Sequence, residues 1–250
     1  MQDSVLQFVH DYGPILEDAK RRLIVIVVFF VFLFIVGFFA SPYLLKALIT
    51  YIHFTTVSYV VLSPFQLLST SMDIGFFFAI VFSMPLVLAE CYEFLADAFT
   101  YKEKKAFLSY LFSSVFFFIL GFAYGGAVLY YAAQAVAAYN SALGLENVWD
   151  IDIFISQTLM TASLLGVLFE YPLLLWVMMR LGVIEKKLLI EGRRIAIAVT
   201  VIVVALLPPT DGLSLIIMSV PLLGMYELTL LLAPERKRQV VPTPVSLQPL

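Results

Sequence analysis

Length, composition and charge place this chain outside most protein classes. It has 250 residues, of which 62% are hydrophobic and 13% are charged, whereas a soluble globular domain is about 45–50% apolar and about 25% charged. The formal net charge of −3 gives no basis for a nucleic-acid partner, and one cysteine with two histidines excludes a disulfide scaffold and a Cys/His metal cluster. The sequence also lacks the short motifs of hydrolytic and nucleotide-binding enzymes, so we expect no catalytic activity, cofactor or metal ion.

The hydropathy pattern predicts an all-α, polytopic membrane protein. In hydrocarbon every backbone N–H and C=O must be satisfied within the protein, so apolar runs of about 20 residues are interpreted as helices. The first run has 18 residues without a polar side chain, and the fifth has only 13 before a Pro-Pro pair. We expect one six-helix domain over residues 1–235, followed by a basic and then disordered tail over 236–250. The predicted spans are 23–40, 66–88, 106–133, 156–179, 195–207 and 213–232.

The placement of Lys and Arg predicts the orientation of these spans. Fourteen of the 15 basic residues precede the first span, follow the last, or lie in the connections after the second and fourth spans; only Lys46 lies on the other side. By the positive-inside rule the basic side is the cytoplasm, so both termini are predicted to be cytoplasmic. The first apolar run is longer than the about 7–15 residues of a signal-peptide core, which favours a retained helix over a cleaved signal.

Acidic side chains inside the predicted spans need a partner or a function, because a charge in mid-membrane costs about 2.5 kcal/mol or more. Glu170 is the clearest case, at position 15 of the 24-residue fourth span. Three interpretations are open: Glu170 is a hydrogen-bonded structural residue beside a backbone loosened at Pro172, it is a polar contact for a substrate or partner helix, or it is a proton site. Asp211 is either the N-cap of the last span or a functional group. Asp73 and Glu227 lie near span ends, where solvation or snorkelling predicts a structural role.

The connection after the second span interleaves acidic and aromatic residues, with the sequence ECYEFLADAFTYKEKK over 90–105. Carboxylates beside aromatic rings can receive a guanidinium by salt bridge and cation–π stacking. The alternative is an interfacial loop whose aromatics sit at headgroup depth and whose Glu103 pairs with neighbouring lysines. Spacing alone favours the interfacial loop.

A series of short motifs follows the order of the expected spans. The segments are LEDAKRRL at 16–23, SPF at 63–65, MPLVL at 84–88, FLADAF at 94–99, YKEK at 101–104, GFAY at 121–124, FEYP at 169–172, PPTD at 208–211 and residues 217–227. No single motif is decisive, but in this order they resemble the TatC family, the polytopic core of the twin-arginine protein translocase, over about residues 14–235.

This chain departs from the family pattern at several points. The acidic residue of the first motif is carried by Glu17 or Asp18, and the register with the following basic residues favours Asp18. Asp97 stands in place of a proline of the family. The spacing before Glu103 is one residue short, and the spacing before Asp211 is one residue long.

The resemblance implies that the chain recognises the signal peptides of folded proteins bearing Arg-Arg and starts their transport, driven by the proton-motive force. Two guanidiniums need carboxylates, which Glu103 together with Asp18 or Glu17 would supply. Phe94 would lie beside the pair and exclude water, which strengthens the contact. The apolar part of the peptide would then lie along a groove leading to Glu170.

The resemblance also implies a location and partners. We expect a multi-pass protein of a prokaryotic plasma membrane, in a receptor complex with further copies of the chain and with single-span TatA/TatB-type subunits. Asp211, Pro64 and Pro209 would serve the docking of a partner helix or the local structure. The short last two spans would thin the bilayer around them.

Three other classes of function are alternatives to this one. A proton- or ion-coupled secondary transporter for small solutes would use Glu170 as the carrier, but the chain shows neither internal repeats nor intramembrane basic partners. An intramembrane protease would need paired aspartates or a Ser/His pair at matching depth, and neither is found. A purely structural scaffold would tolerate Glu103→Ala.

Overall fold

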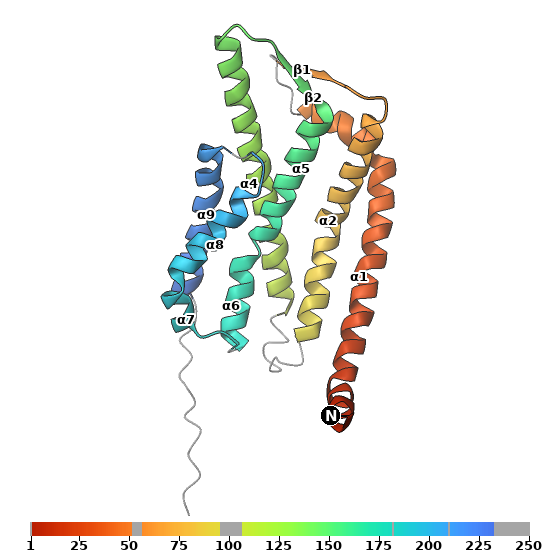
Figure 1. Ribbon diagram of the computed structural model, residues 1–250, viewed down its shortest axis with the longest axis vertical. Coiled ribbons are helices and arrows are strands. Elements are labelled where there is room, and N and C mark those ends of the chain that lie inside the picture. The colour runs from red at the N-terminus through yellow and green to blue at the C-terminus, as the bar shows by residue number, and fades with distance from the viewer. Residues whose placement is uncertain (1, 52–56, 96–106, 182, 210, 233–250) are drawn as a thin grey trace, which may run out of the picture.

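The computed structural model of this chain describes residues 2–51, 57–95, 107–181, 183–209 and 211–232. These residues form an elongated helical bundle with two short strands at its upper end and the start of the first helix at its lower end (Figure 1). The elements are α1 (Gln2–Tyr51), β1 (Val57–Val60), α2 (Gln66–Leu95), α4 (Phe107–Ala142), β2 (Asn147–Asp150), α5 (Ile151–Leu168), α6 (Tyr171–Leu181), α7 (Lys186–Glu191), α8 (Arg193–Ala205) and α9 (Gly212–Leu232).

The helices confirm the predicted membrane segments in position but not in number. Five stretches of the described residues are long and apolar enough to cross a membrane, and the fourth of them joins α5 and α6. The predicted fifth span corresponds to α8, whose 13 residues fall short of that length, so the count of six spans stays a prediction. The five stretches are Glu17–Thr50, Gln66–Cys91, Leu111–Ala142, Ile151–Arg180 and Gly212–Leu232.

The two strands were not predicted. β1 and β2 pair in parallel, with Val57 opposite Asn147 and Val60 opposite Asp150. They join the connection after α1 to the connection after α4, so the upper ends of the two helical hairpins are tied together (Figure 1). The all-α prediction therefore holds for the bundle and misses this small cap.

A row of polar pairs continues from the strands along the interface between α2 and α5. Asp150 caps α5 by accepting the amide of Asp152 at 2.9 Å, and it also accepts from the side chain of Gln66. The polar residues of α2 recur at helical spacing, and each is hydrogen-bonded to a polar group on the α5 side. The pairing reduces the free-energy cost of burying these polar side chains in hydrocarbon. The pairs are Gln66 with Asp150, Thr70 with Asp152, and Asp73 with Ser156.

Close helix contacts depend on glycine at two places. Gly75 of α2 lies against the backbone of α1, where an added Cβ would come within 3.0 Å of the carbonyl oxygen of Phe34. Gly121 of α4 lies against α5, where a Cβ would come within 2.6 Å of the carbonyl oxygen of Leu165. Small residues let helices approach this closely in a membrane, where packing replaces the hydrophobic effect as the driving force.

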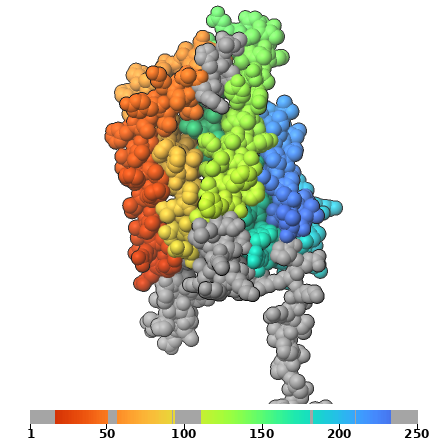
Figure 2. All heavy atoms as spheres, turned by 180° about the vertical axis from the view of Figure 1, so that it is seen from behind, coloured from red at the N-terminus to blue at the C-terminus, as the bar shows by residue number. Residues whose placement is uncertain are grey.

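The short α8–α9 hairpin packs against α4 and α5. Val204 and Leu207 from the first half of the hairpin and Met218 and Leu222 from the second are buried in one cluster with Leu165. Seen from behind, α2 and α4 lie between α1 on one side and α9 on the other (Figure 2). The hairpin thereby completes the bundle beside α4.

Two glycines of α4 give a matched test of this packing. Gly121→Ala should lower the apparent melting temperature of the purified protein in detergent, because its Cβ would meet the carbonyl oxygen of Leu165 and the buried side chain of Phe169. Gly126→Ala should be neutral or stabilising by about 0.5–1 kcal/mol, because nothing lies within 4 Å of its Cβ and alanine favours a helix. Equal shifts for both variants would contradict the close α4–α5 contact.

Candidate functional site

The lower end of the α1–α2 hairpin carries a cluster of one guanidinium and three carboxylates. The Nε of Arg22 donates to Asp18 at 2.8 Å, and its Nη1 donates to Glu90 and to Glu93, each at 2.9 Å. The side chains of Arg22 and Glu90 are 22% and 19% exposed, whereas those of Asp18 and Glu93 are 48% and 62% exposed. We call these four residues the Arg22 cluster, and its formal charge is −2.

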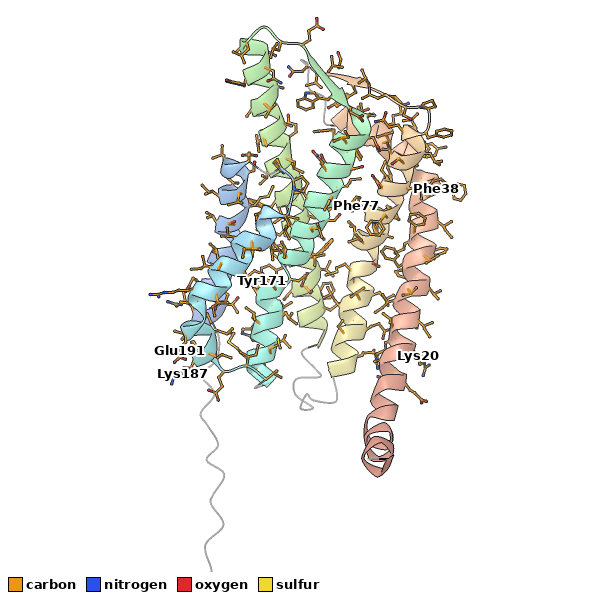
Figure 3. All side chains as sticks on the ribbon, in the orientation of Figure 1. Lys20, Phe38, Phe77, Tyr171, Lys187 and Glu191 are labelled. Atoms are coloured by element: carbon orange, nitrogen blue, oxygen red, sulfur yellow. The ribbon has the colours of Figure 1, made fainter. Side chains whose placement is uncertain are left out.

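The sequence pointed to only part of this cluster. Asp18 was predicted as a contact for a signal peptide, and it is found paired with a guanidinium of the same chain. Its spacing of four residues from Arg22 is a signal for an intrahelical ion pair, but the two contacts with α2 join residues about 70 positions apart. Lys20, by contrast, points away from α2 (Figure 3).

The other predicted contacts for a signal peptide are placed less completely. Glu17 is exposed on α1, next to the cluster in sequence. Phe94 belongs to the last turn of α2, although its side chain lies outside what is described. Glu103 and the substituted Asp97 fall within 96–106, outside the described residues. What the fold establishes is that Asp18 lies near the end of α2 that leads toward Glu103.

Glu170 lies where the predicted fourth span is interrupted. The helix stops at Leu168 and resumes at Tyr171, since Pro172 has no N–H to continue the ladder. The side chain of Glu170 is buried, and its Oε2 accepts a hydrogen bond from the hydroxyl of Ser114 on α4. Its Oε1 is buried without a hydrogen-bond partner among the described residues. One half of the carboxyl group is thus satisfied within the chain, and the other half is buried and unpaired among the described residues.

The turn between α8 and α9 favours the capping interpretation of Asp211. Its Oδ1 accepts the amide of Ser214 at 2.8 Å, and this hydrogen bond holds the pKa of the carboxyl below its ordinary range. The preceding turn is held by Thr161 of α5, whose hydroxyl donates to the carbonyl of Pro208 at 2.5 Å. Pro209 is half-buried in the same turn.

Two further residues of the sequence analysis have local roles. Pro64 is exposed in the turn before α2, beside Ser63, whose carbonyl accepts the amide of Gln66 at 3.1 Å. Glu227, expected to reach the interface, forms a salt bridge of 2.8 Å with Arg193 at the start of α8. In the described part of the chain no group of three or more His, Cys, Asp and Glu side chains is arranged to hold a metal ion.

An apolar groove opens between α1 and α2 above the Arg22 cluster. It encloses about 340 Å³. A second hollow of about 400 Å³ lies at the upper end, where α4, β2 and α5 meet the α8–α9 turn. Of these two hollows the first lies next to the carboxylates, and the predicted groove leading to Glu170 stays a prediction. It is lined by Ile26, Val27, Phe30, Ile80, Ser83, Met84 and Val87.

The fold and sequence were compared with known proteins. A family model described as TatC, the Sec-independent protein translocase protein, matches residues 14–221. The TatCy protein of Bacillus subtilis is 28% identical over 223 residues, covering 87% of this chain and 86% of its own. The TatC protein of Aquifex aeolicus is 28% identical over 241 residues, covering 90% and 96%.

A solved structure agrees with this assignment. The crystal structure of the twin-arginine translocase receptor TatC in DDM superposes with a TM-score of 0.79 at 26% identity, covering 88% of this chain and 99% of that one. The helical bundle and its order of elements are therefore those of a multi-pass membrane protein of this kind. Because the family model covers most of its length, the chain belongs to the TatC family of Sec-independent protein translocases.

Proposed function

We propose that this chain binds twin-arginine signal peptides and starts the transport of folded precursor proteins, driven by the proton-motive force. The observation that carries the proposal is the match to the TatC family over residues 14–221. The transporter alternative would need uptake of a small solute by this chain alone, and family membership counts against it. A translocase subunit needs no covalent chemistry, so no catalytic residue is proposed.

Recognition of the two arginines is assigned to carboxylates at the lower end of the bundle. Glu103 and one of Asp18 and Glu17 each receive one guanidinium, and Phe94 lies beside them. The negative charge of the Arg22 cluster supports this assignment, because it raises the local concentration of cationic peptide. Charge-assisted hydrogen bonds between a guanidinium and a carboxylate are about twice as strong as neutral ones.

The same end is proposed to face the cytoplasm. Arg22 in α1 and Arg193 at the start of α8 belong to the basic set that the positive-inside rule assigns to the cytoplasmic side. Lys46 lies toward the other end of α1. Both termini are then cytoplasmic, and the strand cap lies outside.

Partners are proposed on the α8–α9 side and at Glu170. With 13 residues, α8 is about 20 Å long, against a hydrocarbon core of about 30 Å, so the bilayer thins beside it. The unpaired Oε1 of Glu170 is proposed to bind a polar group of a single-span TatA/TatB-type helix inside the membrane, once the packing that buries this atom opens. The complex also contains further copies of this chain.

Glu103→Ala should weaken binding of a twin-arginine signal peptide by about tenfold or more, since a hydrogen bond to a charged group contributes about 1.5–3 kcal/mol. Fluorescence anisotropy with a labelled peptide and the protein in nanodiscs measures this. Glu191→Ala is the matched control, because Glu191 is 63% exposed and pairs with Lys187 on α7. Unchanged affinity for Glu103→Ala at low and at high salt would remove the assigned role.

The partner-contact and structural interpretations of Glu170 predict different protein abundance and different export for its variants. If it contacts a partner helix, Glu170→Gln keeps most export because the amide retains an acceptor and donors, while Glu170→Ala impairs export at normal abundance. If it is structural, Glu170→Ala and Ser114→Ala both lower abundance, because a buried group is left unsatisfied at about 1–3 kcal/mol. Immunoblots measure the abundance of each variant, and an export assay measures its transport. Normal abundance together with normal export in Glu170→Ala would contradict both interpretations.

The orientation can be tested by labelling single cysteines from outside. In a Cys91→Ser background, Glu146→Cys should react with a membrane-impermeant maleimide in intact cells, and Lys187→Cys should react only after lysis. The reverse pattern would overturn the assignment of the basic side to the cytoplasm.

A further inference from the structure

Two of the contacts between α1 and α2 differ in kind. Toward the upper end the helices touch through Gly37 and Gly75, where backbone meets backbone and no larger side chain fits. At the lower end the guanidinium of Arg22 joins α1 to Glu90 and Glu93 of α2. The first contact is steric and permanent, whereas the second is ionic and exchangeable.

The apolar groove occupies the space between these two contacts. Its α1 wall starts at Ile26, one helical turn after Arg22, and its α2 wall ends at Val87, one turn before Glu90. The hydroxyl of Ser83 in the wall donates to the carbonyl of Ile80, which leaves apolar side chains facing the hollow. A charged cluster therefore adjoins an apolar groove directly.

The lower part of α2 has a point at which it can bend. Pro85 lies inside α2 at the level of the groove, and its missing N–H removes one hydrogen bond of the helix. Glu90 and Glu93 both follow Pro85, so the segment that Arg22 holds is the segment below the bend. Releasing Arg22 frees that segment to move away from α1 while the glycine contact stays in place.

The Arg22 cluster is also built to exchange its cation. Three carboxylates face one guanidinium, and Asp18 and Glu93 are about half exposed or more. A second guanidinium that reaches the three carboxylates meets a cluster charge of −2, although exposed Lys20 and Arg21 adjoin it on α1. Because carboxylates outnumber the cation within the cluster, a cationic peptide fits it better than an anionic lipid headgroup does.

We propose that Arg22 is a latch over the α1–α2 groove. The signal-peptide arginine that pairs with Asp18 replaces Arg22 at Glu90 and Glu93 as well, and the apolar segment that follows the arginines lies between α1 and α2. This inference rests on the proposed function and adds to it an internal competitor and a path for the apolar segment. The order of the peptide, charge first and apolar residues next, matches the order of cluster and groove.

The latch is tested by removing the competing guanidinium. For the full chain in nanodiscs, Arg22→Gln should bind a fluorescent twin-arginine peptide about twofold to fivefold more tightly, the range expected for a partly exposed ion pair. Arg21→Gln, one position away and exposed, should leave the affinity unchanged. Unchanged or weaker binding by Arg22→Gln overturns the latch. Arg22→Lys keeps the charge but loses the planar fork, and should give a smaller tightening if Arg22→Gln does not fold.

The groove is tested by filling it. Val27→Trp places a large ring in the hollow and should weaken binding about fivefold or more, whereas Val28→Trp, on an exposed position outside the groove, should not. If Val27→Trp and Val28→Trp change the peptide affinity equally, the apolar segment does not bind between α1 and α2. Glu93→Gln should also weaken binding without loss of folding, since its side chain is 62% exposed.

A control separates the failure of this inference from the failure of the proposed function. The unmodified chain is titrated with a peptide in which both arginines are lysines. Equal binding of the two peptides would contradict twin-arginine recognition itself. A preference for arginine together with unchanged binding by Arg22→Gln and Val27→Trp would overturn the latch and groove alone.

Discussion

The constraint on which the rest of this structure depends is the need to satisfy every backbone polar group in hydrocarbon, where an unpaired group costs several kcal/mol. Pro221 lies inside α9, so the carbonyl of Ile217, four residues earlier, has no amide of the helix to bind. The hydroxyl of Tyr124 on α4 donates to that carbonyl at 2.6 Å. Thr161 serves the carbonyl of Pro208 in the same way at the turn before α9.

Hydrogen bonds of this kind connect the α8–α9 hairpin to α4, α5 and α6. Tyr171, at the start of α6 (Figure 3), donates its hydroxyl to the carbonyl of Leu222 on α9. Tyr226 of α9 donates to the carbonyl of Leu189 on α7 at 2.7 Å. A short, interrupted hairpin can therefore remain in the membrane because neighbouring helices complete its hydrogen bonding. The break between α5 and α6 brings the carboxyl group of Glu170 into the interior, where only Oε2 is hydrogen-bonded by the described residues.

Hydropathy and proline placement predicted most of this architecture because both act over one helix at a time. The span over 66–88 and the loosening at Pro172 are local properties, and each was found. The pairing of β1 with β2 was missed because four-residue strands carry too weak a pattern to stand out beside helices of 30 residues or more. The contacts of Arg22 with Glu90 and Glu93 were missed because they join positions whose approach depends on the packing of two helices. Glu103, the most specific assignment from the family resemblance, lies outside the described residues and stays a prediction.

An internal guanidinium at a binding cluster has a consequence for how a translocase subunit works. A receptor that must hand its cargo on cannot bind it too tightly, and a competing group of its own lowers the apparent affinity by the fraction of time that it occupies the site. If Arg22 were engaged nine-tenths of the time, the apparent Kd for the peptide would be about tenfold above its intrinsic value. When the peptide leaves, Arg22 recombines with Glu90 and Glu93 without diffusing, because it is held on α1 by the fixed contact at Gly37 and Gly75. Release would then be assisted by the chain itself, which favours turnover over retention.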